Sequence, residues 1–200
     1  MTKTSMTRST LTIGIDLGDR QSHLCALDES DESGEVIEEA RVATTKDAIH
    51  SRFAGLAPAR IALEVGGHSA WVSELLRDLG HEVIVANARK LRMIFQSNSK
   101  TDQLDALQLA RVARLDPELL YGIRHRGRSA RADLAIMRSR DALVATRTKL
   151  VNHVHGVLKS FGHRAKKHAA SSFHRQAAGQ IPDELLPALE PILEALAGAS

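Results

Sequence analysis

Two short stretches of alternating apolar and polar residues, each ending in an acid, constrain the fold of this chain more than any other feature. From Leu11 to Leu17 apolar residues occupy every second position, and Asp16 lies on the opposite face. Residues 60–65 repeat this arrangement with Glu64 in the place of Asp16, and a small residue stands two positions before each acid. Both stretches are therefore predicted to be β-strands with a carboxylate at the end.

The rest of the first half predicts an α/β fold. Residues 22–27 and 35–42 alternate in the same way, so the chain is predicted to open with a three-stranded meander. Thr44 and Asp47 resemble the capping box of a short helix. The elements predicted after the meander are a helix at 44–55, a strand at 60–65, a helix at 68–79, a strand at 82–86 and helices at 88–95 and 102–115. Three strands followed by alternating helices and strands is an RNase H-like order.

The second half predicts an all-α region. Apolar pairs recur every seven residues, which favours a long helix suited to coiled-coil pairing and a homo-oligomer, at Ile136-Met137, Leu143-Val144, Leu150-Val151 and Val157-Leu158. Residues 181–197 are predicted to form short helices that pack back on the long one. We therefore expect a disordered N-terminus at 1–10, an RNase H-like domain at 11–122 and a basic helical coiled-coil region at 123–200.

Charge is unevenly distributed along the chain. Residues 1–85 hold 8 Lys and Arg against 14 Asp and Glu, whereas residues 86–175 hold 19 against 6. A basic block of this density favours a polyanionic partner, and with only 3% aromatic residues the binding is expected to depend on charge rather than on base stacking. The residues predicted to bind nucleic acid are Lys100, Arg124, Arg126, Arg128, Arg131, Arg138, Arg147 and Lys149.

Asp102 and Asp105 are three residues apart at the start of a predicted helix, so their side chains share one face. If that helix begins beside the strand ends that carry Asp16 and Glu64, four carboxylates converge and require cations. Hard oxygen ligands favour Mg²⁺, with Mn²⁺ as the alternative, and such ions support phosphodiester chemistry. The non-catalytic interpretation is that Asp102 is a helix N-cap, Asp105 an acid of its first turn, and the strand acids are turn residues.

Cysteine usage and hydropathy predict a cytoplasmic location. The single cysteine, Cys25, excludes an internal disulfide, and the chain has neither the apolar run of a signal peptide nor that of a membrane span. No Cys and His spacing matches a structural zinc site, and no serine has the neighbours of a nucleophile.

Three segments, GIDLG (14–18), ALEVGGHSAW (62–71) and KTDQLDA (100–106), resemble the blocks of the DEDD transposases of insertion-sequence family 110. The resemblance covers about residues 11–165. It implies a RuvC-like domain that binds Mg²⁺ through Asp16, Glu64, Asp102 and Asp105, and a coiled coil that pairs protomers. It also implies DNA and a structured guide RNA as partners.

The family also carries a carboxy-terminal domain with a nucleophilic serine, and the sequence stops at Ser200 before any such domain. The expectation is therefore a truncated transposase portion that retains metal and nucleic-acid binding, while catalysis by this chain alone is left open.

Three alternatives remain on sequence alone. A Holliday-junction resolvase-like nuclease would share the fold and the acids. A non-catalytic nucleic-acid-binding or dimerisation fragment would use only the basic helix. An actin-like kinase or ATPase would use Gly14–Gly18 as a phosphate loop, but the helical, basic second half has no second Gly-rich loop, which argues against it.

Overall fold

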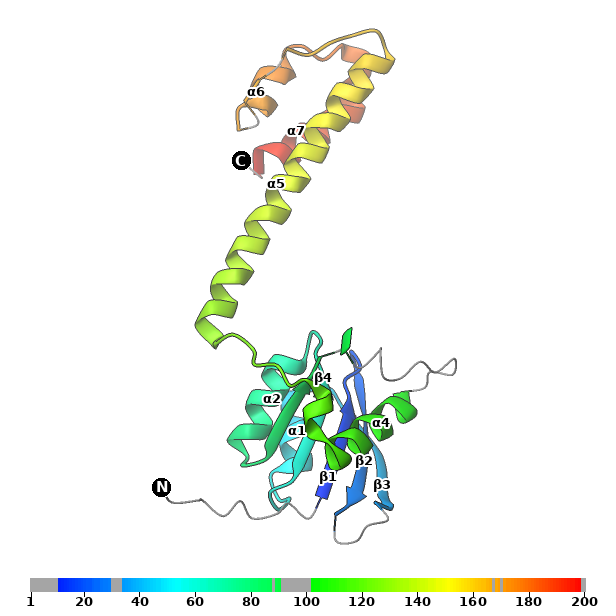
Figure 1. Ribbon diagram of the computed structural model, residues 1–200. Coiled ribbons are helices and arrows are strands. Elements are labelled where there is room, and N and C mark those ends of the chain that lie inside the picture. The colour runs from blue at the N-terminus through cyan, green and yellow to red at the C-terminus, as the bar shows by residue number, and fades with distance from the viewer. Residues whose placement is uncertain are drawn as a thin grey trace. The chain divides into compact units, whose positions relative to one another are not determined.

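The computed structural model describes residues 11–29, 34–87, 89–90, 102–166, 168–169 and 171–198, and for residues 102–104 it describes only the backbone. The chain divides into two compact units, Met1–His125 and Arg126–Ser200, whose elements are labelled in Figure 1. The segment predicted to be disordered, most of the helix predicted at 88–95, and Lys100 lie outside the described residues.

A five-stranded mixed sheet forms the centre of the first unit. Its strands are β1 (Leu11–Asp16), β2 (Gln21–Asp28), β3 (Val36–Ala43), β4 (Arg60–Glu64) and β5 (Glu82–Ala86), in the spatial order β3-β2-β1-β4-β5. The first three strands form an antiparallel meander, and β4 and β5 run parallel to β1. This order confirms the predicted α/β, RNase H-like fold class.

The turn after β1 is closed by Thr44, which the sequence had suggested as a helix cap. That prediction was wrong: helix α1 (Lys46–Phe53) is capped by Thr45, whose side chain accepts a 3.3 Å hydrogen bond from the Ala48 N–H. Thr44 is buried and donates a 2.9 Å hydrogen bond to the Gly18 carbonyl, so the Ser22 hydroxyl donates to Thr44 at 2.8 Å. A buried hydroxyl with two partners inside the fold is not available to cap a helix.

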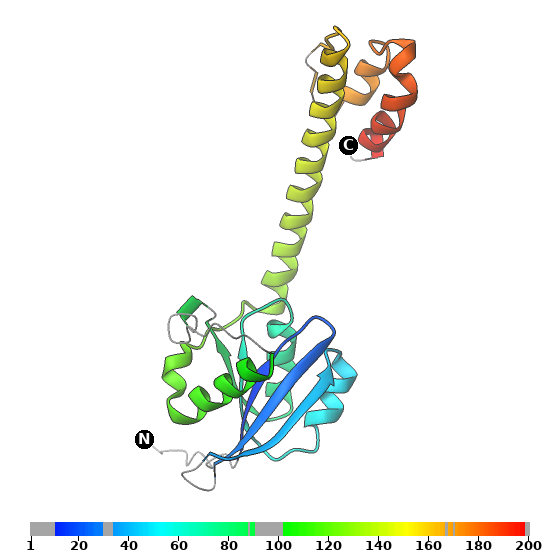
Figure 2. The same cartoon turned by 90° about the vertical axis from the view of Figure 1, so that its right-hand side faces the viewer.

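One face of the sheet packs against α1 and α2 (Ser69–Asp78). Figure 2 shows α1 (cyan) and the green helix α4 (Asp102–Leu115) on opposite sides of the strands. The apolar core on the α1 side includes Ile15, Ile61, Leu63 and Phe53, and Trp71 packs on it.

The other face packs against α4 through small residues. Its buried residues include Ala62, Ala86, Ala106, Ala110 and Ala113. Small side chains on both surfaces let the helix backbone come close to the strands, so α4 is held at a short distance above the sheet.

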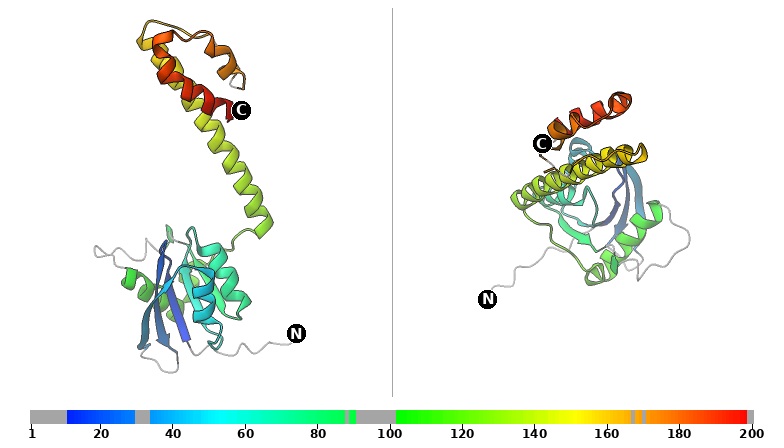
Figure 3. Two further views of the ribbon diagram at one scale, coloured as in Figure 1. Left: turned by 180° about the vertical axis from the view of Figure 1, so that it is seen from behind. Right: turned by 90° about the horizontal axis from the view of Figure 1, so that it is seen from above.

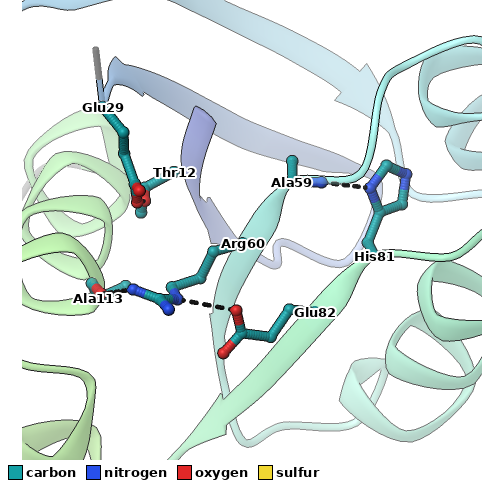
Figure 4. A network of polar contacts seen from close by, with 7 residues as sticks. All are labelled: Thr12, Glu29, Ala59, Arg60, His81, Glu82 and Ala113. Atoms are coloured by element: carbon teal, nitrogen blue, oxygen red, sulfur yellow. Dashed lines mark hydrogen bonds and ion pairs between the residues drawn. The ribbon is translucent and has the colours of Figure 1, made fainter. Parts of the chain in front are cut away.

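Polar side chains fasten the edges of these layers (Figure 4). Arg60 contacts Glu82 at 3.1 Å and donates a 3.3 Å hydrogen bond to the Ala113 carbonyl near the end of α4. His81 is buried; its Nδ1 accepts from the Ala59 N–H at 3.2 Å, which leaves its Nε2 to donate to the Phe53 carbonyl at 3.3 Å. The Thr12 hydroxyl bonds the Glu29 carboxylate.

The second unit is entirely helical. It consists of α5 (Arg128–Ser160), α6 (Phe173–Ala178), the short 3₁₀ helix η2 (Asp183–Leu185) and α7 (Leu186–Gly198). Figure 3 shows the red helix α7 beside the carboxyl-terminal half of α5, where Val154 and Leu158 are fully buried. This confirms that the last segment packs back on the long helix. No helix in the described part of the chain combines the length and apolar character needed to cross a membrane.

Candidate carboxylate site

Asp16 and Glu64 lie at the ends of two neighbouring parallel strands. The register pairs Ile15 of β1 with Leu63 of β4, and each acid is the next residue along its strand. Neighbouring strands are about 4.8 Å apart, so the two acids leave the sheet side by side. Both side chains are half-buried.

The two acids lie on the face of the sheet that α4 covers. Gly14 faces this helix, because a Cβ atom on it would lie only 2.0 Å from the Ala106 carbonyl oxygen. Ala62 packs with the buried residues of α4. Asp16 and Glu64 follow these two small residues by two positions, and alternate residues of a strand share a face.

Helix α4 runs antiparallel to β1. Its Ala106 lies over Gly14, whereas its Ala113 accepts a hydrogen bond from Arg60. Arg60 begins β4, which is parallel to β1, so it marks the end of the sheet opposite the acids. The first turns of α4 therefore lie toward the end of the sheet that carries Asp16 and Glu64.

Asp105 directly precedes Ala106, the residue of α4 that lies over Gly14, and its side chain is half-buried. Asp105 is therefore the α4 acid with a described side chain on the part of the helix that lies toward Asp16 and Glu64. Asp102 is the first residue of α4, and its side chain lies outside the described part of the structure. The fold thus sets Asp16 beside Glu64, and Asp105 lies in the early part of the helix that packs over the same face.

The carboxylate oxygens of these acids are the ligands that a hard divalent cation such as Mg²⁺ or Mn²⁺ prefers. The acids also belong to the same end of the sheet. Among the described residues, however, no three His, Cys, Asp or Glu side chains are grouped tightly enough to hold a metal ion. What the strand register provides is a pair of acids, and α4 faces that pair.

Two histidines that were not predicted as site residues lie close to this end of the sheet. His23 of β2 is the register partner of Asp16, so the two side chains share a face. His68 Nε2 lies 3.5 Å from Asp19 Oδ1, and its Nδ1 accepts a 3.1 Å hydrogen bond from Trp71 Nε1. Because an indole N–H can only donate, His68 carries its ring proton on Nε2, facing Asp19.

Ser69 holds the turn that follows Glu64. Its hydroxyl accepts from the Gly66 N–H at 3.0 Å, donates to the Gly66 carbonyl at 2.8 Å, and lies 3.0 Å from His125 Nε2. The hydroxyl proton is therefore used on Gly66, and His125 is the donor in its contact with Ser69. Ser69 therefore closes the turn at Gly66, and its contact with His125 is one that the sequence did not predict.

The predicted nucleic-acid-binding residues are distributed over both units. Arg124 is exposed in the first unit; Arg126, Arg128, Arg138 and Lys149 are exposed in the second, where Arg131 and Arg147 are half-buried. Their exposure leaves them accessible to phosphates, and their roles stay predictions.

Gly14 and Gly18 each have a packing role in the fold. The space beside Gly14 is filled by the backbone of α4, and a Cβ on Gly18 would lie 2.2 Å from the Gln21 carbonyl oxygen. Both glycines are required by close backbone approach, which argues against the kinase-like alternative.

The family model of the DEDD transposases of the insertion-sequence 110 type, described as a transposase, matches residues 13–163. The chain belongs to this transposase family. The matched range includes all four predicted acids and α5, whereas α6, η2 and α7 lie beyond it.

A comparison with curated protein sequences finds no match to this transposase. Among solved structures, RuvC of Thermus thermophilus is similar over 53% of this chain and 96% of its own, at 14% sequence identity and a TM-score of 0.39. So distant a similarity carries no information about partners or substrate.

Proposed function

We propose that this transposase chain acts on phosphodiester bonds of DNA through divalent cations held by Asp16, Glu64, Asp105 and Asp102. The observation that supports this most is the register of β1 and β4, which sets Asp16 beside Glu64 on the face covered by α4. Two half-buried carboxylates on adjacent strands offer the oxygen ligands that a hard divalent cation prefers.

When bound, Mg²⁺ or Mn²⁺ would supply positive charge to the phosphate and to the attacking oxygen. The residues of the chain position that charge. Gly14 lets α4 lie directly on β1, and the packed alanines leave little freedom for Asp105 to move relative to the sheet.

The test is Mn²⁺ and Mg²⁺ binding measured by calorimetry on the whole chain, for wild type, Asp16→Asn, Glu64→Gln and Asp105→Asn. The matched control is Asp78→Asn, an exposed acid at the end of α2. We expect each site variant to weaken binding at least about tenfold, since each removes one ligand charge. Equal affinity in site variants and control would rule out the assigned ligands.

We further propose that the basic residues bind DNA and a structured guide RNA. Lysine and arginine contacts to phosphates release counterions, so affinity should fall steeply with salt. Anisotropy titrations at several salt concentrations would compare wild type with Arg126→Gln/Arg128→Gln, and with the exposed Arg175→Gln as control. An unchanged salt slope in the double variant would remove these two arginines from the interface.

The exposed apolar residues of α5 support a homo-oligomer. Ile136 is 68% and Leu143 is 58% exposed, and both belong to the seven-residue repeat. Sedimentation equilibrium of Ile136→Ser/Leu143→Ser should show weaker self-association than wild type. The control Leu115→Ser changes a leucine of the first unit that is 78% exposed. A monomeric wild type would exclude this role for α5.

The two remaining alternatives can be separated by substrate and by metal. A Holliday-junction resolvase-like nuclease would cleave a four-way junction without guide RNA. A non-catalytic binding fragment is favoured by the exposed face of α5, and its nucleic-acid affinity would be indifferent to Mg²⁺ and to Asp16→Asn. The cytoplasm, where the chain would meet DNA, stays the predicted location.

A further inference from the structure

Tyr121 is the single tyrosine of the chain and lies exposed after the 3₁₀ helix η1 (Pro117–Leu120). Among the described residues it is the only one other than glycine with a positive φ, at φ 46° and ψ 53°. This left-handed conformation disfavours side chains with a Cβ, and Gly122, which would adopt it freely, stands one position too late. An aromatic ring is therefore held out of the core at a position where glycine would cost less.

The backbone on both sides of Tyr121 is fastened to β5. The Asn87 N–H donates to the Leu120 carbonyl at 3.0 Å, and the Ile123 N–H donates to the Val85 carbonyl at 2.9 Å. The Tyr121 N–H itself donates to Glu118 at 2.9 Å. The unfavourable conformation thus persists because the surrounding contacts determine it, which is the usual condition of strained residues at functional sites.

Positive charge lies directly on the exposed ring. Lys90 Nζ is 4.3 Å from the ring centroid of Tyr121, and the neighbouring Arg89 is exposed as well. Asn87 holds the backbone at Arg89, the first residue of the basic pair Arg89 and Lys90, because its Oδ1 accepts a 3.1 Å hydrogen bond from the Arg89 N–H. A flat π-surface and two cations that can reach a phosphate together match the parts of one nucleotide.

The backbone of this group follows β5 at the end of the sheet where Glu64 lies. Glu64 of β4 pairs with Ala86 of β5, and Asn87, the next residue, bonds Leu120, the residue before Tyr121. Two strand spacings of about 4.8 Å separate these backbones, so the Tyr121 backbone is about 10 Å from that of Glu64. A single nucleic-acid strand is long enough to span this separation.

We propose that Tyr121 stacks on one unpaired base of the DNA strand that the carboxylates act on, while Lys90 and Arg89 neutralise its phosphate. The proposal rests on the proposed function, because it concerns the substrate of the same site. Stacking requires a base outside a duplex, so the preferred ligand is single-stranded or locally unpaired DNA. The low aromatic content had suggested that no stacking platform exists; one ring at the right place is sufficient.

The test is fluorescence anisotropy of labelled dT12, its RNA counterpart rU12 and a duplex of the same length, with the whole chain in Mg²⁺. Tyr121→Leu removes the ring, and Tyr121→Phe keeps it. The matched control Phe161→Leu removes an exposed aromatic residue of the second unit, and Lys46→Gln, on the α1 side of the sheet, is the control for Lys90→Gln. Circular dichroism and thermal melting verify that every variant is folded.

We expect Tyr121→Leu to weaken dT12 binding about tenfold, with Tyr121→Phe, Phe161→Leu and Lys46→Gln near wild type. Duplex binding should change little in Tyr121→Leu, and Lys90→Gln should reduce the salt slope. A 5-iodouracil strand should cross-link to Tyr121.

Three results would overturn the proposal. If wild type binds dT12 but Tyr121→Leu matches Phe161→Leu, the ring is a structural cap for Lys90, and the proposed function survives. If only rU12 is affected, the stacked strand is RNA and the assignment to DNA is wrong. If wild type binds no nucleic acid, the proposed function fails with it.

Discussion

Helices α4 and α5 carry similar apolar patterns but use them in opposite ways. In α4 three alanines, Ala106, Ala110 and Ala113, are almost fully covered where the helix packs against the sheet, together with Leu109 and Val112. In the first half of α5 the apolar residues are large and exposed, and Val154 is the first fully buried residue of the helix.

The difference shows what each helix is for. A helix that positions a charged side chain has to be held rigidly, and close packing of small side chains on a glycine achieves this. A helix that leaves large apolar side chains in water at seven-residue intervals loses hydrophobic stabilisation until another surface covers them. Helix α4 is thus part of the core of its unit, whereas the first half of α5 leaves its large apolar side chains uncovered.

The largest expected effect on stability is the difference between two glycine-to-alanine substitutions, one in β1 beneath α4 and one in α5. Gly14→Ala would place a Cβ 2.0 Å from the Ala106 carbonyl oxygen and should cost about 3–5 kcal/mol in the free energy of unfolding, since backbone must move. Gly156→Ala in α5 meets nothing within 4 Å and should stabilise the chain by about 0.5–1 kcal/mol. Urea unfolding measures both, and the same sign at both positions would refute the close approach of α4.

The next effect separates the two halves of α5. Leu158 is fully buried, and Leu158→Ala should cost about 2–4 kcal/mol in the unfolding of the second unit. Leu143 is 58% exposed, and Leu143→Ala should change monomer stability by less than about 0.5 kcal/mol. Thermal melting at two protein concentrations would test both predictions. If the chain self-associates through the surface that contains Leu143, the melting temperature of wild type also depends on concentration.

A smaller effect concerns two arginines. Arg60→Gln removes the contacts with Glu82 and the Ala113 carbonyl and should cost about 1 kcal/mol. Arg140, which lies 3.8 Å from Asp141 with both side chains mostly exposed, is the control, and Arg140→Gln should have no measurable effect. Equal losses in the two variants would mean that Arg60 does not anchor the end of α4.

The smallest expected effect is the pH dependence of stability that arises from Cys25, which packs against α4. Burial raises the pKa of the Cys25 thiol from its usual 9.0, Glu39 adds to the rise and Arg111 opposes it. The folded state therefore holds the neutral thiol, so its contribution to stability is complete below pH 9 and is lost as the pH rises further. Iodoacetamide should label folded wild type slowly at pH 8 and label Gly14→Ala faster. Equal rates in folded and urea-unfolded wild type would show that α4 does not cover Cys25.

Much of the fold follows from local patterns. Alternation over 11–17 and 60–65 predicted two strands that end in Asp16 and Glu64, because the period of two is a property of the strand itself. The helical part and its packed end follow from periodicity in the same way.

Predictions that depended on contacts between distant segments did less well. Thr44 and Thr45 both suit a cap, and only the meander, which buries Thr44 against Ser22 and Gly18, selects between them. The sequence did not predict that His23 lies beside Asp16, because the strand register that pairs them depends on the length of the turn between β1 and β2. Tyr121 had no pattern around it at all.

By itself the sequence determined which residues are strand acids, which helix is long and basic, and which family the three blocks resemble. Only the tertiary structure decided that Asp16 lies beside Glu64, that Gly14 brings α4 to the same face, and that the backbone before Tyr121 bonds to the residue after β5. The physical reason is that periodicity along a chain orients each side chain relative to its own element. Strand pairing and helix packing, which join segments far apart in sequence, set the distances between elements.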